Sequence, residues 1–318
     1  MQSLSGPANI DPVSNTQGTS LRKGHNMTAY NKKSVTVIGL GPMGQATVKV
    51  LLDAGYDVTA WNRTRPKLDA IAELGAKPAD TVAEAIAAND VVLLSLIHYD
   101  AMYGVLEQGP ADLAGKTIVN LSSDSPEKTR KGAAWVTERG AAFVTGAYMT
   151  QSDDLKHASS RLYVSGPETD YEAHRELLET LVPGVEYLGD DYGLAQLYYQ
   201  AGLAQFHAFL TSLEQAVAII DAGGGDVDKF IEFASNGTES NRDFTLFFGA
   251  AAKQGGWGDI ANLKMMHAGA QHVIDAAEEV GVDASLTRAV QDHYQRALDA
   301  SEKAGHPVPV YQILRNAA

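Results

Sequence analysis

Residues 34–44 read SVTVIGLGPMG, and this stretch decides the fold of the 318-residue chain. Its β-branched start predicts a short strand, and the pattern of Met43–Ala54 predicts a helix directly after it. The glycines fit G-x-G-x-x-G in the strand-to-helix context that the motif needs. Gly39 permits the tight turn, Gly41 lets a pyrophosphate approach the backbone, and Gly44 allows the helix to pack closely on the strand. The stretch predicts a dinucleotide site, with these cofactor-binding residues: Gly39, Leu40, Gly41, Pro42 and Met43.

The end of the second strand indicates which dinucleotide is bound. The strand VTAW, residues 58–61, runs into NRTR at 62–65, and Lys67 follows. An NAD site usually carries a carboxylate at this tip for the ribose 2′-hydroxyl, and the sequence has none there. Arginine suits a 2′-phosphate instead, because guanidinium binds phosphate through two hydrogen bonds. The alternative is a solvated loop, but the position favours NADP(H). The predicted contacts are Asn62, Arg63, Thr64 and Lys67, with Arg63 and Thr64 as the strongest candidates.

Strand and helix patterns alternate along residues 32–192. Strands are predicted at 57–62, 91–96, 116–123, 141–148, 161–167 and 185–190, and helices at Lys67–Leu74, Thr81–Ala88, Asp100–Leu106, Pro126–Arg139 and Tyr171–Leu181. Such alternation is typical of βαβ units around a mostly parallel sheet. The sequence therefore predicts an α/β Rossmann domain over residues 32–192.

The strand pattern stops at Gly193. From Gly193 to Ile220 the one charged residue is Glu214, so we expect an interdomain helix over residues 193–222. A helix that is apolar on nearly all sides has to be buried on nearly all sides. The remaining residues, 223–318, predict an all-α domain with four helices: Asp226–Ser235, Asn241–Gln254, Asp259–Val280 and Ala284–Lys303. These four helices are too few to bury all sides of so long a helix. The sequence therefore predicts a domain-swapped homodimer, and the alternative is a monomeric helical cap.

The composition excludes several classes of protein. The net charge of -14 disfavours nucleic acid or an anionic membrane as a partner, since both need basic patches. The absence of cysteine excludes disulfide scaffolds, thiol nucleophiles and cysteine-ligated metals. The nine histidines form no HExxH motif, so no catalytic metal is expected.

The first segment, residues 1–31, is polar and has neither periodicity nor the apolar core of a signal peptide. We expect a disordered leader or an extension added for expression, with Met27 as a candidate internal start. No apolar run reaches the roughly 18 residues of a membrane span. These features predict a cytoplasmic protein that does not associate with membranes.

Three segments carry a resemblance to a known family. VIGLGPMGQATVKVLLDAGYDVTAWNRT at residues 37–64 and NLSSDSP at 120–126 are similar to the β-hydroxyacid dehydrogenase superfamily. GDDYGLAQLYY at residues 189–199 is the discriminating segment, and it most resembles the NADPH-dependent imine reductases. The likeness extends from Ser34 to the C-terminus.

The resemblance implies a 6-phosphogluconate dehydrogenase-like arrangement, in which two subunits exchange their helical domains. Each active site would lie between the Rossmann domain of one subunit and the helical domain of the other. The implied activity is NADPH-dependent reduction of cyclic imines and iminium ions to amines, and in some members reductive amination of ketones. The expected partners are a second copy of the chain and a small-molecule imine or amine.

The residues of the long helix favour the same chemistry. Hydroxyacid dehydrogenases of the superfamily carry a lysine on this helix, and this chain has none between His157 and Asp228. Reducing a ketone builds negative charge that a cation stabilises, whereas hydride attack on an iminium removes positive charge. The missing lysine therefore favours imine reduction. Two alternatives stay open: a β-hydroxyacid or semialdehyde reductase with a displaced base, such as Lys264, and a non-catalytic NADP(H)-binding module.

Tyr199 is the predicted catalytic residue. The imine reductases that the chain resembles carry Asp or Tyr at this position, which implies a proton donor or a substrate-orienting group. An unperturbed tyrosine titrates at about 10, so Tyr199 holds its proton at neutral pH. The alternative is a core aromatic, because Gly202, Leu203 and Phe206 share its helical face.

Other candidates follow strands of the predicted sheet or flank Tyr199 on its helix, and for the bulky apolar ones ordinary core packing is the alternative. The predicted cofactor contacts of this group are Leu96 and Ser122, and the predicted substrate pocket comprises Ser123, Tyr148, Met149 and Leu203.

Overall fold

The computed structural model describes residues 33–236, 245–247, 249–251 and 263–316. Within them the chain forms an eight-stranded sheet in the order β3-β2-β1-β4-β5-β6-β7-β8. All neighbours pair in parallel except β6 and β7, which are antiparallel. The strands are β1 (Ser34–Ile38), β2 (Asp57–Trp61), β3 (Lys77–Pro78), β4 (Val91–Leu94), β5 (Thr117–Asn120), β6 (Ala142–Met149), β7 (Arg161–Ser165) and β8 (Gly184–Tyr187).

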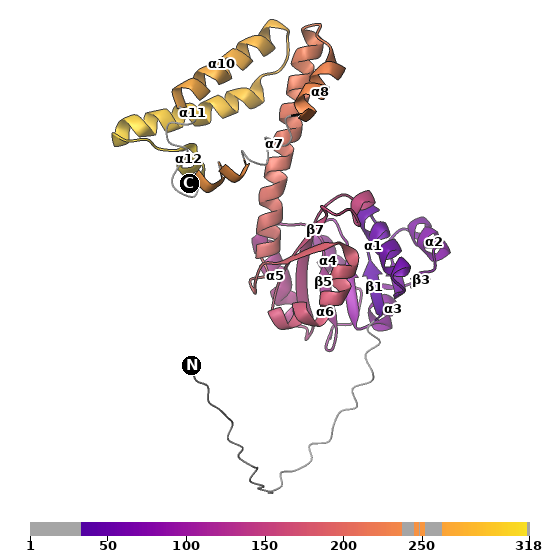
Figure 1. Ribbon diagram of the computed structural model, residues 1–318. Helices are drawn as coiled ribbons and strands as arrows, with labels where there is room; N and C mark the ends of the chain where they lie inside the picture. The colour runs from indigo at the N-terminus through magenta and orange to yellow at the C-terminus, as the bar shows by residue number, and fades with distance from the viewer. Residues whose placement is uncertain (1–32, 237–244, 248, 252–262, 317–318) are drawn as a thin grey trace, which may run out of the picture.

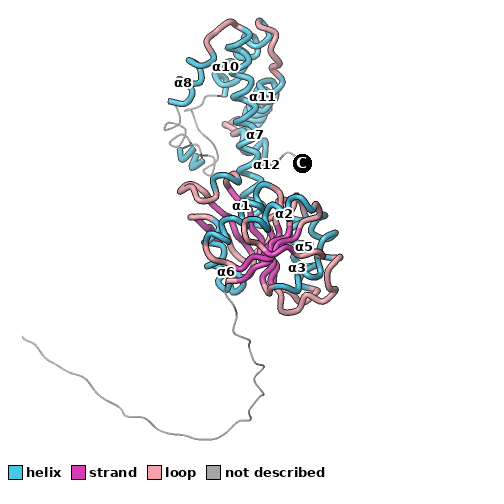
Figure 2. Tube along the Cα trace, turned by 90° about the vertical axis from the view of Figure 1, so that its right-hand side faces the viewer, coloured by secondary structure: helices cyan, strands magenta, loops and turns pink. Residues whose placement is uncertain are grey.

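Helices cover both faces of this sheet, which is seen between them in Figure 2. They are α1 (Pro42–Asp53), α2 (Arg65–Glu73), α3 (Val82–Ala88), α4 (Tyr99–Leu106), α5 (Pro126–Thr137) and α6 (Glu168–Leu181). Successive strand residues join opposite cores: Val91 and Leu93 pack with α1, α2 and α6, while Val92 and Leu94 pack with α3, α4 and α5. Because both faces are buried, the strands are apolar throughout rather than alternating.

The strand order reverses between β1 and β4. The chain leaves β1 toward β2 on one side, and it leaves β4 toward β5 on the other. In open α/β sheets this divergence creates a crevice at the carboxyl ends of the strands, where ligands bind. The loops after β1, β2, β4 and β5 therefore meet at one edge.

A single helix, α7 (Leu194–Ala222), connects the sheet domain to the helical domain (Figure 1). Its 29 residues span about 43 Å. Only Ala195 and Gln196 of α7 are buried. The first turns of the helix contact the sheet domain, and beyond them it extends away from the sheet. In Figure 1 α7 runs from the sheet domain to the helical domain, so the two domains are separated along this one helix.

The helical domain has a small core of its own. It contains α8 (Val227–Asn236), α10 (Leu263–Glu279), α11 (Ser285–Ala304) and α12 (Val310–Arg315). Ile274, Ala277 and Ala284 are buried between α10 and α11, with Ile219 of α7 packed against them. The far end of α7 is thus tied to the helical domain, and its beginning is tied to the sheet.

Among the described residues, α7 is also the one helix long and apolar enough to cross a membrane. Length and composition are weak grounds, because the central helix of a water-soluble assembly passes the same test. What the structure adds is that, within the described residues, large apolar side chains of α7 such as Phe206 and Phe209 are exposed.

The predicted class, an α/β Rossmann domain followed by an all-α domain, is confirmed. Several elements differ. The short β3, the 3-10 helix at Ser152–Asp154 and α12 were not expected. Helix α2 begins at Arg65 rather than at Lys67, and α6 begins at Glu168 rather than at Tyr171. The leader at 1–31 lies outside the described residues, and so does most of the helix expected over Asn241–Gln254. The exchange of domains between subunits stays a prediction.

Candidate functional site

The glycine loop between β1 and α1 has the geometry that its motif predicts. Gly39 has a φ of +98°, and a Cβ there would lie 2.3 Å from the carbonyl oxygen of Ser95. A Cβ on Gly44 would lie 2.0 Å from the carbonyl oxygen of Gly39. A Cβ on Gly41 would have no atom of the described chain within 4 Å apart from its neighbours in sequence, so this side of the backbone is open to a ligand. Gly41 is also the N-cap of α1 and Pro42 its first residue, which turns the positive end of the helix toward that opening.

Asn62 braces this loop against the end of β2. Its Oδ1 accepts a hydrogen bond from the N–H of Leu40 at 3.0 Å. Its Nδ2 donates to the hydroxyl of Thr64 at 2.7 Å and to the Thr64 carbonyl at 3.1 Å. The two loops that would hold a pyrophosphate and a 2′-phosphate are therefore fixed to each other before any ligand arrives.

The basic residues after β2 have different surroundings. Arg65 donates to Asp69 at 2.8 Å and to Asp80 at 2.7 Å. The hydrogen bond that Arg65 donates to Asp80 is the largest of the effects that raise the Arg65 pKa above its usual value. Arg63 lies exposed on the loop before α2, and Lys67 lies exposed in the first turn of α2. The contact of Arg63, Thr64 and Lys67 with a 2′-phosphate stays a prediction.

The loops after β4 and β5 are tied to each other as well. The N–H of Leu96 donates to the hydroxyl of Ser122 at 3.0 Å. The N–H of Ser122 donates in turn to Oδ1 of Asn120 at 3.0 Å. The Leu96 side chain lies against Gly39, where a Cβ would come within 2.8 Å of its Cδ2. Leu96 therefore reaches the predicted cofactor loop, while Ser122 is buried beneath it and holds Leu96 in place.

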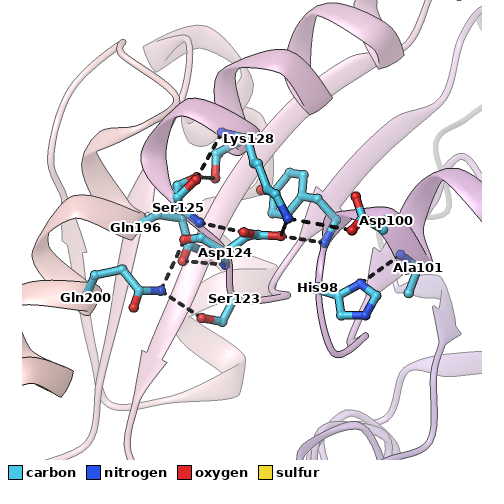
Figure 3. A network of polar contacts seen from close by, with 11 residues as sticks. His98, Asp100, Ala101, Ser123, Asp124, Ser125, Lys128, Gln196 and Gln200 are labelled. Carbon is cyan, nitrogen blue, oxygen red and sulfur yellow. Dashed lines mark hydrogen bonds and ion pairs between the residues drawn. The ribbon is translucent and has the colours of Figure 1, made fainter.

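Two glutamines of α7 meet the loop after β5, as Figure 3 shows. Gln196 is fully buried, and its Nε2 donates to the carbonyls of Ser122 at 3.0 Å and Gly146 at 3.2 Å. Its Oε1 accepts from the N–H of Asp124 at 3.3 Å. One turn later, Nε2 of Gln200 donates to the Ser123 hydroxyl at 3.0 Å and to the Asp124 carbonyl at 3.1 Å.

A carboxylate lies within this network. Burial raises the pKa of Asp124, but the N–H groups of Ser125 and Tyr99 and the ammonium of Lys128 outweigh it, and the pKa falls below its usual range. Lys128 lies 3.4 Å from Asp124 and 3.6 Å from Asp100. Beyond Asp100, His98 accepts the N–H of Ala101 at 3.1 Å and caps α4 (Figure 3). Near Ser123 the loop thus carries a fixed negative charge whose nearest cation is shared by two carboxylates.

Tyr199 lies beside Gln200 on the same turn of α7. Its side chain is half-buried, and this burial raises the pKa of its hydroxyl. The hydroxyl is therefore protonated at neutral pH and becomes a weaker acid than an exposed tyrosine. Leu203, one turn further along α7, is also half-buried.

Comparison with known proteins assigns the chain to a family. Residues 34–189 match the NAD binding domain of 6-phosphogluconate dehydrogenase. Residues 191–316 match the C-terminal domain of NADPH-dependent reductive aminase-like proteins. An NADPH-dependent reductive aminase from Aspergillus oryzae is 30% identical over 270 residues, which cover 84% of this chain and 92% of that protein. The chain belongs to the family of NADPH-dependent imine reductases and reductive aminases.

Solved structures of this family share the fold. An imine reductase from Streptomyces aurantiacus is 39% identical, with a TM-score of 0.82 over 90% of this chain and 99% of that one. A reductive aminase from Aspergillus terreus, in complex with NADPH and ethyl-5-oxohexanoate, is 28% identical, with a TM-score of 0.80 over 84% of this chain and 94% of that one. The family's enzymes are oxidoreductases that act on C=N bonds.

For a member of the imine reductase family, the two residues at the end of β6 have contrasting positions. Tyr148 is in the core, where its hydroxyl lies 3.0 Å from that of Thr47 on α1 and burial raises its pKa. Met149 faces α7, and a Cβ on Gly202 would come within 2.9 Å of its Cε. Neighbouring strand residues point to opposite faces, so only Met149 shares the α7 side with Tyr199. The structure therefore places Tyr148 between β6 and α1 rather than at the predicted pocket.

Sequence reasoning missed the glutamines and Asp124 as parts of the site. In the sequence, Gln196 and Gln200 stand out only as polar interruptions of an apolar helix. Their spacing of four residues was the available signal, because it puts both amides on one helical face. The partners of those amides lie 50 or more residues away in sequence, so only the folded chain identifies them.

Proposed function

We propose that this chain reduces cyclic imines and iminium ions to amines with NADPH, and that it also carries out reductive amination. The dinucleotide cradle is the glycine loop at residues 39–44 together with the loop after β2 that Asn62 fixes to it. The observation that carries the proposal is that this cradle occurs in one chain with Tyr199, on a helix that has no lysine. Both family relatives with NADPH in their descriptions support the same cofactor.

The residues present fit NADPH. The open backbone at Gly41 and the start of α1 suit the pyrophosphate, while Arg63, Thr64 and Lys67 suit the 2′-phosphate. When bound, the cofactor supplies the hydride. Asn62 and Ser122 support the site, because their hydrogen bonds hold the glycine loop and Leu96 in place.

The charges around the loop after β5 favour a cationic substrate. Positive charge disappears as hydride reaches an iminium, so a neighbouring cation would raise the energy of the bound ion. Asp124 contributes a negative charge, and Lys128 is held by Asp124 and Asp100. This arrangement suits an iminium and disfavours the carboxylate of a β-hydroxyacid. Tyr199 is the proposed donor of a proton or hydrogen bond to the substrate nitrogen.

We also propose that a second copy of the chain covers α7. Five large apolar side chains of α7 are more than a third exposed: Leu197, Tyr198, Phe206, Phe209 and Leu210. A groove of about 400 Å³ with mostly apolar walls lies between α7, α10 and α11. Interfaces of obligate homodimers are apolar in the same way. A second copy rather than lipid is the proposed cover, because the start of α7 is hydrogen-bonded into the sheet domain.

One assay separates the candidate activities. NADPH consumption is followed with a cyclic imine, with the semialdehyde of a β-hydroxyacid, and with no substrate. We expect turnover with the imine and a much weaker response with NADH in place of NADPH. Turnover of the semialdehyde alone would replace this proposal with the hydroxyacid-type reductase, and tight NADPH binding without turnover of any compound would indicate a binding module.

A further inference from the structure

The first two turns of α7 are held to the sheet domain far more firmly than the rest of the helix. Before α7 begins, Asp191 accepts two hydrogen bonds from Arg130, at 2.8 and 2.7 Å, and one from the N–H of Gly193 at 2.9 Å. The N–H of Ala195 donates to the Ser165 hydroxyl at 3.0 Å. These contacts fix where the helix starts and in which direction it leaves.

Gln196 and Gln200 then fix the rotation of the helix about its axis. Together their amides make five hydrogen bonds to the loop at residues 122–124 and to Gly146. Each amide bonds to at least two different groups of the sheet domain. A small rotation of the helix about its axis would therefore break several hydrogen bonds at once. A buried amide left without partners costs on the order of 1–3 kcal/mol, which makes such a turn unfavourable.

Tyr199 lies inside this clamped segment. It is next to Gln200 and within one turn of Gln196, and the last contact with the sheet domain noted above is that of Gly202 with Met149. Further along, side chains such as Phe206 and Phe209 are exposed. The Tyr199 hydroxyl therefore moves with the domain that carries the dinucleotide cradle, not with the helical domain.

We propose that Gln200, supported by Gln196, is a positioning residue that holds the Tyr199 hydroxyl in register with the bound cofactor. This inference rests on the proposed role of Tyr199, which is to donate a proton or a hydrogen bond to the substrate nitrogen. Gln200 acts through the loop, because the same amide engages the Ser123 hydroxyl and the Asp124 backbone. Misplacement of a reacting group by about 1 Å costs rates on the order of a hundredfold, so loss of the clamp lowers turnover without removing any reacting group.

The test is a double-mutant cycle in the full-length protein with a cyclic imine and NADPH. Gln200→Met keeps the length of the side chain and removes both donors, and Gln200→Glu serves as a second, more polar variant. Gln108→Met is the matched control, since its amide also donates to a backbone carbonyl but lies exposed at the end of α4. NADPH affinity and the melting temperature are recorded for every variant.

We expect Gln200→Met to lower kcat roughly tenfold, with NADPH affinity and imine KM nearly unchanged. In a Tyr199→Phe background the same change should have no further effect on kcat, because the group that it positions is gone. Gln108→Met should match the unmodified chain.

Three outcomes would overturn the inference. An unchanged kcat in both Gln200 variants shows that the clamp is dispensable. Effects of Gln200→Met and Tyr199→Phe that multiply in the double variant show that Gln200 acts independently of Tyr199. A parallel loss of NADPH affinity shows a general structural role. Absence of imine turnover by the unmodified chain is a separate result, because it removes the proposed function itself.

Discussion

At the residue scale, Tyr199 combines a retained proton with partial burial. Because burial raises its pKa, the hydroxyl donates a hydrogen bond across the neutral range and is not expected to ionise there. We expect Tyr199→Phe to keep the fold and NADPH binding and to lower kcat for imine reduction at least about tenfold, since a positioned acid contributes about a hundredfold or more. Steady-state kinetics with a cyclic imine measure this. Retained turnover would exclude the proton-donor role.

Two neighbouring arginines predict different effects on cofactor choice. Arg63 is exposed beside the cradle, whereas Arg65 is held by Asp69 and Asp80. A hydrogen bond between charged groups contributes about 1.5–3 kcal/mol, so Arg63→Ala should weaken NADPH binding about tenfold or more and leave NADH binding nearly unchanged. Arg65→Ala is the control and should preserve the NADPH-to-NADH ratio. Fluorescence titration of both cofactors checks this, and an equal loss for both would contradict a 2′-phosphate contact.

At the element scale, the start of α7 depends on a salt bridge. The hydrogen bonds from Arg130 are the main reason that the Asp191 pKa falls to about 2. Because this pKa is depressed in the folded state, the stabilisation is complete above the unfolded value near 3.8 and is lost as pH falls through 2. Gly193 leaves room for this contact, since a Cβ there would lie 2.7 Å from the Arg130 guanidinium.

We therefore expect Arg130→Met to melt at a lower temperature than the unmodified chain at pH 5–7, and the gap to shrink toward pH 2. Melting curves across that range measure the gap. A gap that stays constant or widens on acidification would show that the Arg130 contribution comes from packing instead of from the charge pair.

The same elements show how far sequence patterns reach. Every strand after β1 except β3 was predicted, because buried parallel strands are continuous apolar runs. The two-residue β3 is too short and too exposed to leave such a run. Helix α2 begins at Arg65 because Pro66 is tolerated in a first turn, a signal that the polar stretch concealed. The glutamine clamp was out of reach, because its partners are set by the folding of β5 and β6 beside α7.

At the scale of the whole molecule, α7 joins two bodies and exposes apolar side chains between them. If a second chain covers this surface, a charge placed in its middle should prevent assembly. We expect Phe209→Glu to halve the mass measured by light scattering and to abolish imine turnover, while NADPH still binds, since the described cradle lies in one chain. Leu74→Glu, at an equally exposed apolar residue that caps the C-terminal end of α2, is the control. An unchanged mass for Phe209→Glu would contradict cover by a second copy at this position.

Tyr199 is predicted from the resemblance to imine reductases, and its role stays a prediction. The sequence by itself determined the class of the protein, the dinucleotide loop and the preference for NADP(H). Each of these is local, since it depends on residues a few positions apart in a strand, a turn or one helical face. The tertiary structure alone decided that Asn62 and Ser122 brace the cradle, that Tyr148 belongs to the core and that Gln196 and Gln200 hold α7. Those roles depend on hydrogen bonds between segments far apart in the chain, and such bonds exist only once the sheet has brought the segments to one edge.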